Sequence, residues 1–428
     1  MKEIQNIRNA VKFIQSNCSA DDYTFSVNNS DQHYTRFAQN GITQHISGQK
    51  QSVSLSVAFA ARTGTASVNR LDQDSLLNLV KTAESLAKLN QPDPEFVPSE
   101  PACELPEVDN FSTNTAELTI ETMVDNIQKC VENARIRKAI VSGISERNIN
   151  TSYFMTKNGF EGYDKTTSFS HSMTMKKDDV ETKVSNSVLD HAKFDMNRQI
   201  DLLNSQFDSL KKPVELKPGR IPVILRPAAV LQWMFYLIWT FDRRNADEGV
   251  TPFTGQIGKK FFGENFSFRS RLDDPDLIAG KFSPEGIPGS NIDWIERGVI
   301  RNMTTDRYYG KKLQIPAMNP YNIILDGGET SESEMMQMVD HGVIVNNLWY
   351  IRPVDRKTGE WTGLTRDGVL YFEKGEVKHS VYNFRWNEIL HTATERILAL
   401  GPAIQQEYYA RIPTLLIDDF NFVDVTTF

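Results

Sequence analysis

The feature that most constrains this chain is a strongly apolar run from Ala228 to Phe241, which only Gln232 interrupts. It follows a break at Pro227 and stops at the charged residues 242–244. A helix that crosses a bilayer needs about 20 predominantly apolar residues, so this run is too short to span a membrane. We therefore predict a buried helix inside a large core, and no membrane partner.

Composition and charge narrow the class of protein. The chain has 428 residues, of which 39% are hydrophobic and 24% are charged, as in ordinary globular proteins of two or three domains. A formal net charge of −8 argues against a nucleic-acid partner, because a phosphate backbone requires a basic face. The cysteines Cys18, Cys103 and Cys130 are few and far apart, which predicts neither a disulfide framework nor a metal knuckle. Together with an N-terminus that lacks a signal-peptide core, they favour the cytoplasm.

Residues 1–215 are predicted to form an N-terminal α+β domain with a possible internal duplication. The first ninety or so residues read as a helix, strand-like runs with a hairpin signal at Asn40-Gly41, and a second helix. A proline-rich and acidic linker or strap follows at about 90–115, and the pattern then repeats with a hairpin signal at Asn158-Gly159. The two sets of strands could complete one sheet. The alternative is a chance likeness between two α+β units.

Residues 216–428 are predicted to form a β-rich C-terminal domain with few helices. The apolar helix follows a buried strand, "RIPVIL", and precedes a long polar segment from Asp242 to Asp306. The stretch "GETSESEMMQMVDHG" predicts a short helix that begins with a capping box of Ser331 and Glu334 and stops at Gly342. Strand-like runs then occupy residues 343–355, 360–386 and 414–425. The expected fold class of the whole chain is α+β.

The residues alone show no catalytic motif. A helical zinc site needs two histidines about one helical turn apart, and no two histidines of this chain meet that spacing. Glu388 and His391 form a single E-x-x-H step, but a carboxylate-bridged metal centre needs a second one, so we expect a surface or capping role. A cysteine or serine paired with a histidine only in space stays open. The seven histidines are His33, His45, His171, His191, His341, His379 and His391.

Several stretches, taken together, carry a resemblance to a known family. They are "YTRFAQNGITQHI" at 34–46, "FTGQIGKKF" at 253–261, "DGGETSESEMMQMVDHGVIVNNL" at 326–348 and "GLTRDGVLYFEKGEVKHSVYNFRWNE" at 363–388. In this order they resemble segments of the TldD/PmbA family, which are metalloprotease-related proteins also known as modulators of DNA gyrase. The resemblance covers nearly the whole chain.

The resemblance implies a zinc site whose residues this chain lacks. In the catalytic TldD-type subunit, the helix before the "FTGQIG"-like segment carries an H-E-x-x-x-H motif. Counting back from Phe253 places Met234 and Trp239 nearest the two histidines and Phe235 nearest the glutamate. None of the three can bind zinc or act as a base, and a register shift of one residue leaves that unchanged. The family's C-terminal ligand cysteine is also missing, because Cys130 is the last cysteine. The pattern is closer to the PmbA/TldE-type subunit, with no metal and no cofactor expected.

The resemblance further implies a dimer that encloses unstructured peptides, either a homodimer or a heterodimer with a TldD-type zinc subunit. Extended peptides are expected to bind by strand addition. Arg366, Asp367 and Gly368 sit where the family suggests substrate-groove residues, and a plain hairpin turn is the other interpretation. The leading hypothesis is a non-catalytic subunit that serves peptide proteolysis or maturation. Its rivals are an active hydrolase with a non-standard site and a stand-alone peptide-binding regulatory module.

Overall fold

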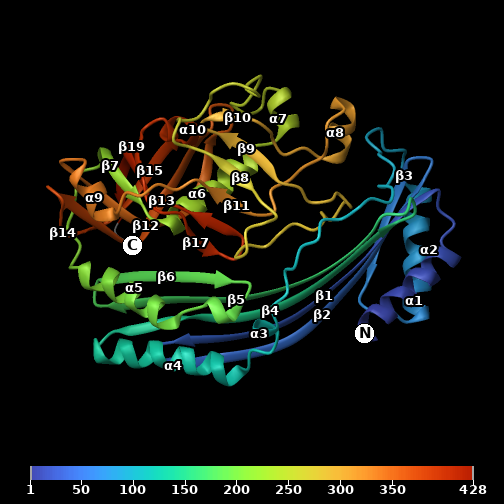
Figure 1. The fold of residues 1–428 in the computed structure, drawn as a ribbon, viewed down its shortest axis with the longest axis horizontal. Coiled ribbons are helices and arrows are strands. Elements are labelled where there is room, and N and C mark those ends of the chain that lie inside the picture. The colour runs from blue at the N-terminus through green and yellow to red at the C-terminus, as the bar shows by residue number, and fades with distance from the viewer. Residues whose placement is uncertain (1, 427–428) are drawn as a thin grey trace.

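The computed structural model describes residues 2–426, and its first half builds one six-stranded antiparallel sheet in the order β3-β2-β1-β4-β5-β6. Figure 1 shows α1 and α2 at one end of the long strands, and α4 and α5 at the other end. The first set of elements is α1 (Lys2–Asn17), β1 (Asp22–Ala38), β2 (Gly41–Phe59), β3 (Arg62–Val68) and α2 (Gln73–Leu89). The second set is α3 (Thr113–Ala116), α4 (Ile120–Ile136), β4 (Ile140–Thr156), β5 (Glu161–Lys177), β6 (Val180–Val188), η1 (His191–Lys193) and α5 (Met196–Ser209).

The two sets repeat one topology. Each has a helix, a three-stranded meander and a second helix, with α3 and η1 added in the second set. The first strands of the two meanders, β1 and β4, pair antiparallel from Thr24↔Thr156 to Phe37↔Gly143, which joins the meanders at the centre of the sheet. The prediction that the two strand sets complete one sheet is therefore confirmed.

Alternation along the strands explains where the helices pack. In the serine-rich run of β2, Val53, Leu55 and Val57 are buried under α1 and α2, while the serines between them face the other side of the sheet. Val27 of β1 belongs to the same core. Ten residues further along, Phe37 lies on the same face of β1 and joins the separate core under α4 and α5. One face of the sheet therefore carries both helix pairs, with a gap between them.

The proline-rich segment between α2 and α3 is a strap that ties the two halves together. The backbone N–H and the hydroxyl of Ser99 donate to the carboxylate of Asp22, at 2.6 and 2.5 Å. Further along, the side-chain amide of Asn110 donates to the carbonyl oxygen of Ala279 at 2.8 Å. These bonds hold an irregular segment in place without a helix or a strand.

The C-terminal half contains two further sheets and few helices, which confirms the predicted α+β class. One sheet has the strand order β10-β9-β8-β11-β18-β17. In the other, pairing of β12 with β13 closes β12-β7-β19-β15-β13 into a ring, with β14 and β16 attached. The division into domains at residues 215 and 216 stays a prediction.

The helices of the C-terminal half are α6 (Pro227–Thr240), α7 (Arg243–Asp247), α8 (Arg307–Leu313), α9 (Glu332–Gln337) and α10 (Leu390–Thr394). The strands are β7 (Gly219–Leu225), β8 (Phe268–Ser270), β9 (Ile292–Glu296), β10 (Val299–Ile300), β11 (Ile323–Leu325), β12 (His341–Asp355), β13 (Glu360–Glu373), β14 (Glu376–Val381), β15 (Asn383–Ile389), β16 (Ile397–Leu400), β17 (Ile404–Glu407), β18 (Ala410–Ile412) and β19 (Leu415–Thr426).

The apolar run forms α6, and its inward face lies in the main core of the C-terminal half. Val230, Trp233 and Leu237 pack with strand residues of both C-terminal sheets, such as Val223 and Phe268. This packing confirms the predicted buried helix. No helix within residues 2–426 combines the length and the apolar character that a membrane crossing requires.

The short helix α9 confirms one predicted boundary and corrects the other. Ser331 and Glu334 form the expected capping box. The helix ends at Gln337, however, and Gly342 lies in β12. A Cβ atom at Gly342 would lie 2.6 Å from the ring of Phe372 and 2.7 Å from the carbonyl oxygen of Pro222. The glycine therefore permits close strand packing and does not end a helix.

Candidate functional site

Helix α6 is fixed at both its start and its middle by polar contacts. Arg226, just before the helix, donates to both carboxylate oxygens of Glu332, at 2.8 and 2.7 Å, and to the side chain of Asn346. Gln232, a polar residue near the middle of the apolar run, accepts a hydrogen bond from the backbone N–H of Leu348 in β12. Gln232 thus satisfies a strand amide, which explains its place in an apolar helix.

The three positions that the family resemblance singles out do not share one face of α6. Met234 is 1% exposed and lies in the core, whereas Phe235 and Trp239 are 45% and 56% exposed. The ring of Phe235 lies 6.1 Å from that of Tyr409, and the ring of Trp239 lies 5.7 Å from that of Trp361. The outward face of the helix is therefore aromatic. Within residues 2–426 there is no group of three or more histidine, cysteine, aspartate or glutamate residues that could hold a metal ion.

A cysteine–histidine pair that no spacing in the sequence indicates lies under α4. The Sγ atom of Cys130 lies 3.6 Å from Nε2 of His171. Both residues are buried, and burial raises the pKa of the Cys130 thiol to about 12 and lowers the pKa of His171 to about 4. A cysteine nucleophile must be a thiolate, so a buried neutral thiol beside a neutral imidazole is a packing pair.

The E-x-x-H step of Glu388 and His391 separates into two unrelated sites. The carboxylate of Glu388 is 4% exposed, forms an ion pair with the Nη2 atom of Arg396 at 2.7 Å, and accepts a hydrogen bond from the backbone N–H of Asn421. The imidazole of His391 stacks on Phe261 with 4.5 Å between the ring centroids. The expected surface role of Glu388 is therefore wrong: it is the buried partner of an arginine.

His391 is expected to make the chain less stable in mild acid. Burial lowers the pKa of His391 to about 4, below its ordinary value of 6.5, so the unfolded chain binds the proton first as the pH falls. Stability from the neutral ring is complete above pH 6.5 and is lost as the pH falls toward 4. Between pH 7 and pH 5, the free energy of unfolding should fall by about 2 kcal/mol more in the wild type than in His391→Phe. Urea unfolding at both pH values measures this difference, and equal losses in the two proteins would contradict the assignment.

The predicted groove residues lie at a bulge within β13. The register shifts between Val345↔Val369 and Asn347↔Arg366, so two residues of β13 lie opposite the single residue Asn346 of β12, and the strand continues through them. The two residues of the bulge are Asp367, at φ 61°, and Gly368, at φ 91°. The alternative of a plain hairpin turn is therefore wrong.

The three side chains of this bulge point to different surroundings. The guanidinium of Arg366 lies 4.3 Å from the ring centroid of Trp349. Asp367 is buried, accepts a hydrogen bond from the side chain of Asn347 at 2.9 Å, and has its pKa raised by desolvation. Asp367 and Gly368, but not Arg366, line a cavity of about 510 Å³ between the ends of β6 and α5 and the strands β13 to β15.

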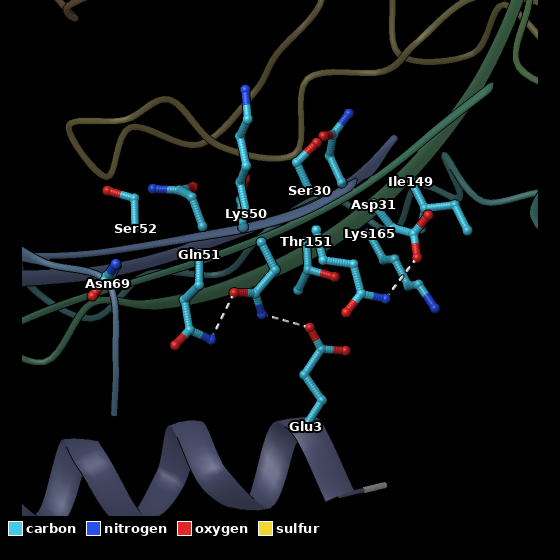
Figure 2. Close-up of a pocket in the computed structure, with 15 residues that line it drawn as sticks. Glu3, Ser30, Asp31, Lys50, Gln51, Ser52, Asn69, Ile149, Thr151 and Lys165 are labelled. Atoms are coloured by element: carbon cyan, nitrogen blue, oxygen red, sulfur yellow. Dashed lines mark hydrogen bonds between the residues drawn. The ribbon is translucent and has the colours of Figure 1, made fainter. Parts of the chain in front are cut away.

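A second cavity, of about 1130 Å³, lies over the middle of the first sheet. Figure 2 shows Glu3, at the start of α1, and Gln51 of β2 among the lining residues. The side-chain amide of Asn29 donates to Glu3 and accepts from Gln51, which links α1 to the sheet. Its lining residues all belong to the first half of the chain, so the cavity is not part of the α6 region.

The comparisons with known proteins decide the family. Residues 218–424 match the PmbA/TldA metallopeptidase C-terminal domain. Over these residues the chain belongs to the TldD/PmbA family. It is 28% identical over 126 residues to the zinc metalloprotease TldD homolog of Saccharolobus solfataricus, an alignment that spans 29% of this chain and 28% of that relative.

Solved structures of the same fold extend the likeness over the whole chain. TldE from Thermococcus kodakarensis superimposes with a TM-score of 0.87 at 17% identity, covering 98% of this chain and 99% of that one. A protein from Thermotoga maritima described as a modulator of DNA gyrase gives a TM-score of 0.86 at 16% identity, with the same coverage. A similarly described protein from Bacteroides thetaiotaomicron gives 0.85 at 16% identity and covers 99% of both chains. At such identities the likeness establishes the fold.

Proposed function

We propose that this TldD/PmbA-family protein is a non-catalytic subunit that holds unstructured peptides. The observation that carries the proposal is the make-up of α6, where the family's zinc-binding positions correspond to Met234, Phe235 and Trp239. A thioether in the core and two outward aromatic rings offer neither a zinc ligand of the family's kind nor a general base. The protein acts as a homodimer or beside a TldD-type subunit that supplies the zinc.

Two further observations favour this proposal over an active hydrolase with its own site. The Cys130–His171 pair is buried and neutral, which does not suit a nucleophile. Glu388 is engaged by Arg396 and therefore is not a free base. A stand-alone peptide-binding regulatory module shares the same peptide chemistry and differs in having no zinc-bearing partner. Cys18, Cys103 and Cys130 form no disulfide, which suits a reducing compartment such as the cytoplasm.

The test is metal analysis of protein purified without chelator, with a peptidase assay on an unstructured peptide in the same preparation. We expect less than stoichiometric zinc and no cleavage, but binding of the peptide. Adding a TldD-type zinc subunit should then yield cleavage that a chelator abolishes, if the heterodimer is the working form. Stoichiometric zinc together with chelator-sensitive cleavage by this chain alone would overturn the proposal.

A further inference from the structure

The β12–β13 hairpin carries large aromatic side chains that the fold leaves uncovered. Trp349 and Tyr350 of β12 are 46% and 53% exposed, although both lie beside a well-packed core. Bulky aromatic residues in neighbouring exposed positions are uncommon on a protein surface and mark interaction sites. Trp239 of α6 adds a third such ring, at 56% exposure.

Local backbone geometry turns these rings outward. The pairing of β12 with β13 shifts register between Trp349 and Arg352, which marks a bulge. Tyr350, inside this bulge, has a φ of 55°, a conformation that a bulky L residue adopts only at a cost. A bulge re-aims side chains, and here it places two successive aromatic residues on the surface. The strained backbone at Tyr350 therefore lies at the same place as the two exposed rings.

Each exposed ring is covered by an arginine. The guanidinium of Arg352 lies 4.2 Å from the ring centroid of Tyr350, and that of Arg366 lies 4.3 Å from Trp349. The rings of Trp349 and Tyr350 are 5.5 Å apart, so these four side chains form one continuous cluster. At the hairpin turn a further arginine lies over a ring of α6 at 4.8 Å. We name the six residues together the arginine–aromatic surface: Trp239, Trp349, Tyr350, Arg352, Arg356 and Arg366.

The charge of this surface is not neutralised by the fold. Among residues 2–426, no carboxylate forms an ion pair with Arg352 or Arg356, while Arg366 lies 3.6 Å from the buried Asp367. Residues 349–357 contain three cationic side chains and one carboxylate, that of Asp355. A locally positive surface is thus built into a chain whose net charge is −8.

We propose that the arginine–aromatic surface binds acidic segments of unstructured peptides. Stacked guanidinium groups keep their N–H donors free at the edge, where they can receive carboxylates in a bidentate manner. The rings offer apolar contact area at a small cost in side-chain entropy, and tryptophan, tyrosine and arginine are the residue types that dominate binding energy at interfaces. This inference rests on the proposed function and gives its peptides a chemical class.

The arrangement of charges favours an acidic peptide over two other possible occupants of this surface, a second copy of the chain and single-stranded nucleic acid. A second copy docked across a two-fold axis on this surface would bring arginines against arginines, and like charges in contact oppose association. Single-stranded nucleic acid also stacks on aromatic rings, but it carries a phosphate on every nucleotide and is held by a basic groove that follows its backbone, whereas this surface offers three arginines. An acidic peptide matches both the rings and the local charge.

The test is fluorescence anisotropy with the full chain and three labelled, unstructured peptides of equal length that carry glutamate, lysine or only uncharged residues. We expect the glutamate peptide to bind roughly tenfold more tightly than the lysine peptide, with the difference shrinking at high salt. The double variant Arg352→Gln/Arg356→Gln and the single variant Trp349→Ala should each weaken the glutamate peptide about tenfold or somewhat less. Circular dichroism confirms that each variant is folded.

Arg36→Gln is the control, because Arg36 also lies over an aromatic ring, that of Tyr34 in the first sheet at 5.6 Å, and its replacement removes one positive charge outside the arginine–aromatic surface. It should leave peptide binding unchanged. Equal affinity for the three peptides would overturn this inference and leave the proposed function standing. Absence of binding by all three would overturn the proposed function itself. A preference for labelled oligothymidylate, or a dimer that the double variant dissolves, would show that another occupant covers the surface and would overturn the inference.

Discussion

Replacing Glu388 by alanine is expected to lower the free energy of unfolding by about 3–5 kcal/mol, because it leaves the buried Nε and Nη2 atoms of Arg396 without their close counter-charge. The Glu388 carboxylate is 4% exposed and the Arg396 side chain 25% exposed, and their contact measures 2.7 Å. The same carboxylate also accepts from the backbone N–H of Asn421 in β19. The substitution therefore removes a link between β15, the connection from α10 to β16, and β19, as well as a charge.

Chemical denaturation of the Glu388→Ala variant measures this loss. Asp419→Asn is the matched control, since Asp419 is 47% exposed and lies 3.9 Å from the other side of Arg396. An exposed ion pair contributes less than about 1 kcal/mol, so the control should stay close to the wild type. A Glu388→Ala variant as stable as the control would mean that Arg396 finds solvent or another partner. It would also reopen Glu388 as a residue available for chemistry.

Restoring a histidine at Met234 is expected to destabilise the chain by roughly 2–4 kcal/mol rather than to begin a metal site. Met234 is 1% exposed and lies in the apolar core with Val230 and Leu237. An imidazole there would lose the packing of the thioether and would bury polar nitrogens without an obvious partner. Trp239→His, on the half-exposed face of the same helix, should cost about 1 kcal/mol, mainly through the lost contact with Trp361.

Thermal or urea unfolding of the two histidine variants, with and without added zinc, tests this asymmetry. Zinc that binds only the folded state would raise the stability of a variant that forms a site. We expect no zinc-dependent increase for Met234→His. A stable Met234→His variant that zinc stabilises further would contradict the inward orientation of this residue. It would then show that α6 still holds the geometry of a metal site with altered residues.

The family and the subunit type within that family rest on different observations. The C-terminal part of the ordered resemblance is confirmed by the family match over residues 218–424, and the fold of TldE is shared over 98% of the chain. The finer assignment to a non-catalytic subunit depends on which residue types occupy α6, and those are read from the sequence. What the fold adds is their orientation, with one position in the core and two outside.

Local periodicity accounts for what the sequence by itself determined. Alternation of valine and leucine with serine in β2 predicted a half-buried strand, and the apolar run of α6 predicted a buried helix, because side-chain direction repeats every two residues in a strand and every 3.6 in a helix. The two similar meanders likewise predicted one shared sheet. The capping box of Ser331 and Glu334 involves neighbours three residues apart, so it too was predictable.

Only the tertiary structure decided the contacts between residues that are distant along the chain. Cys130 meets His171 across 41 positions, and Gln232 meets Leu348 across 116. The bulges at Tyr350 and Asp367 arise where β12 and β13 close a ring of strands, and no local pattern encodes that closure. The physical reason is that periodicity fixes which way a side chain points, whereas strand pairing and packing fix what it meets.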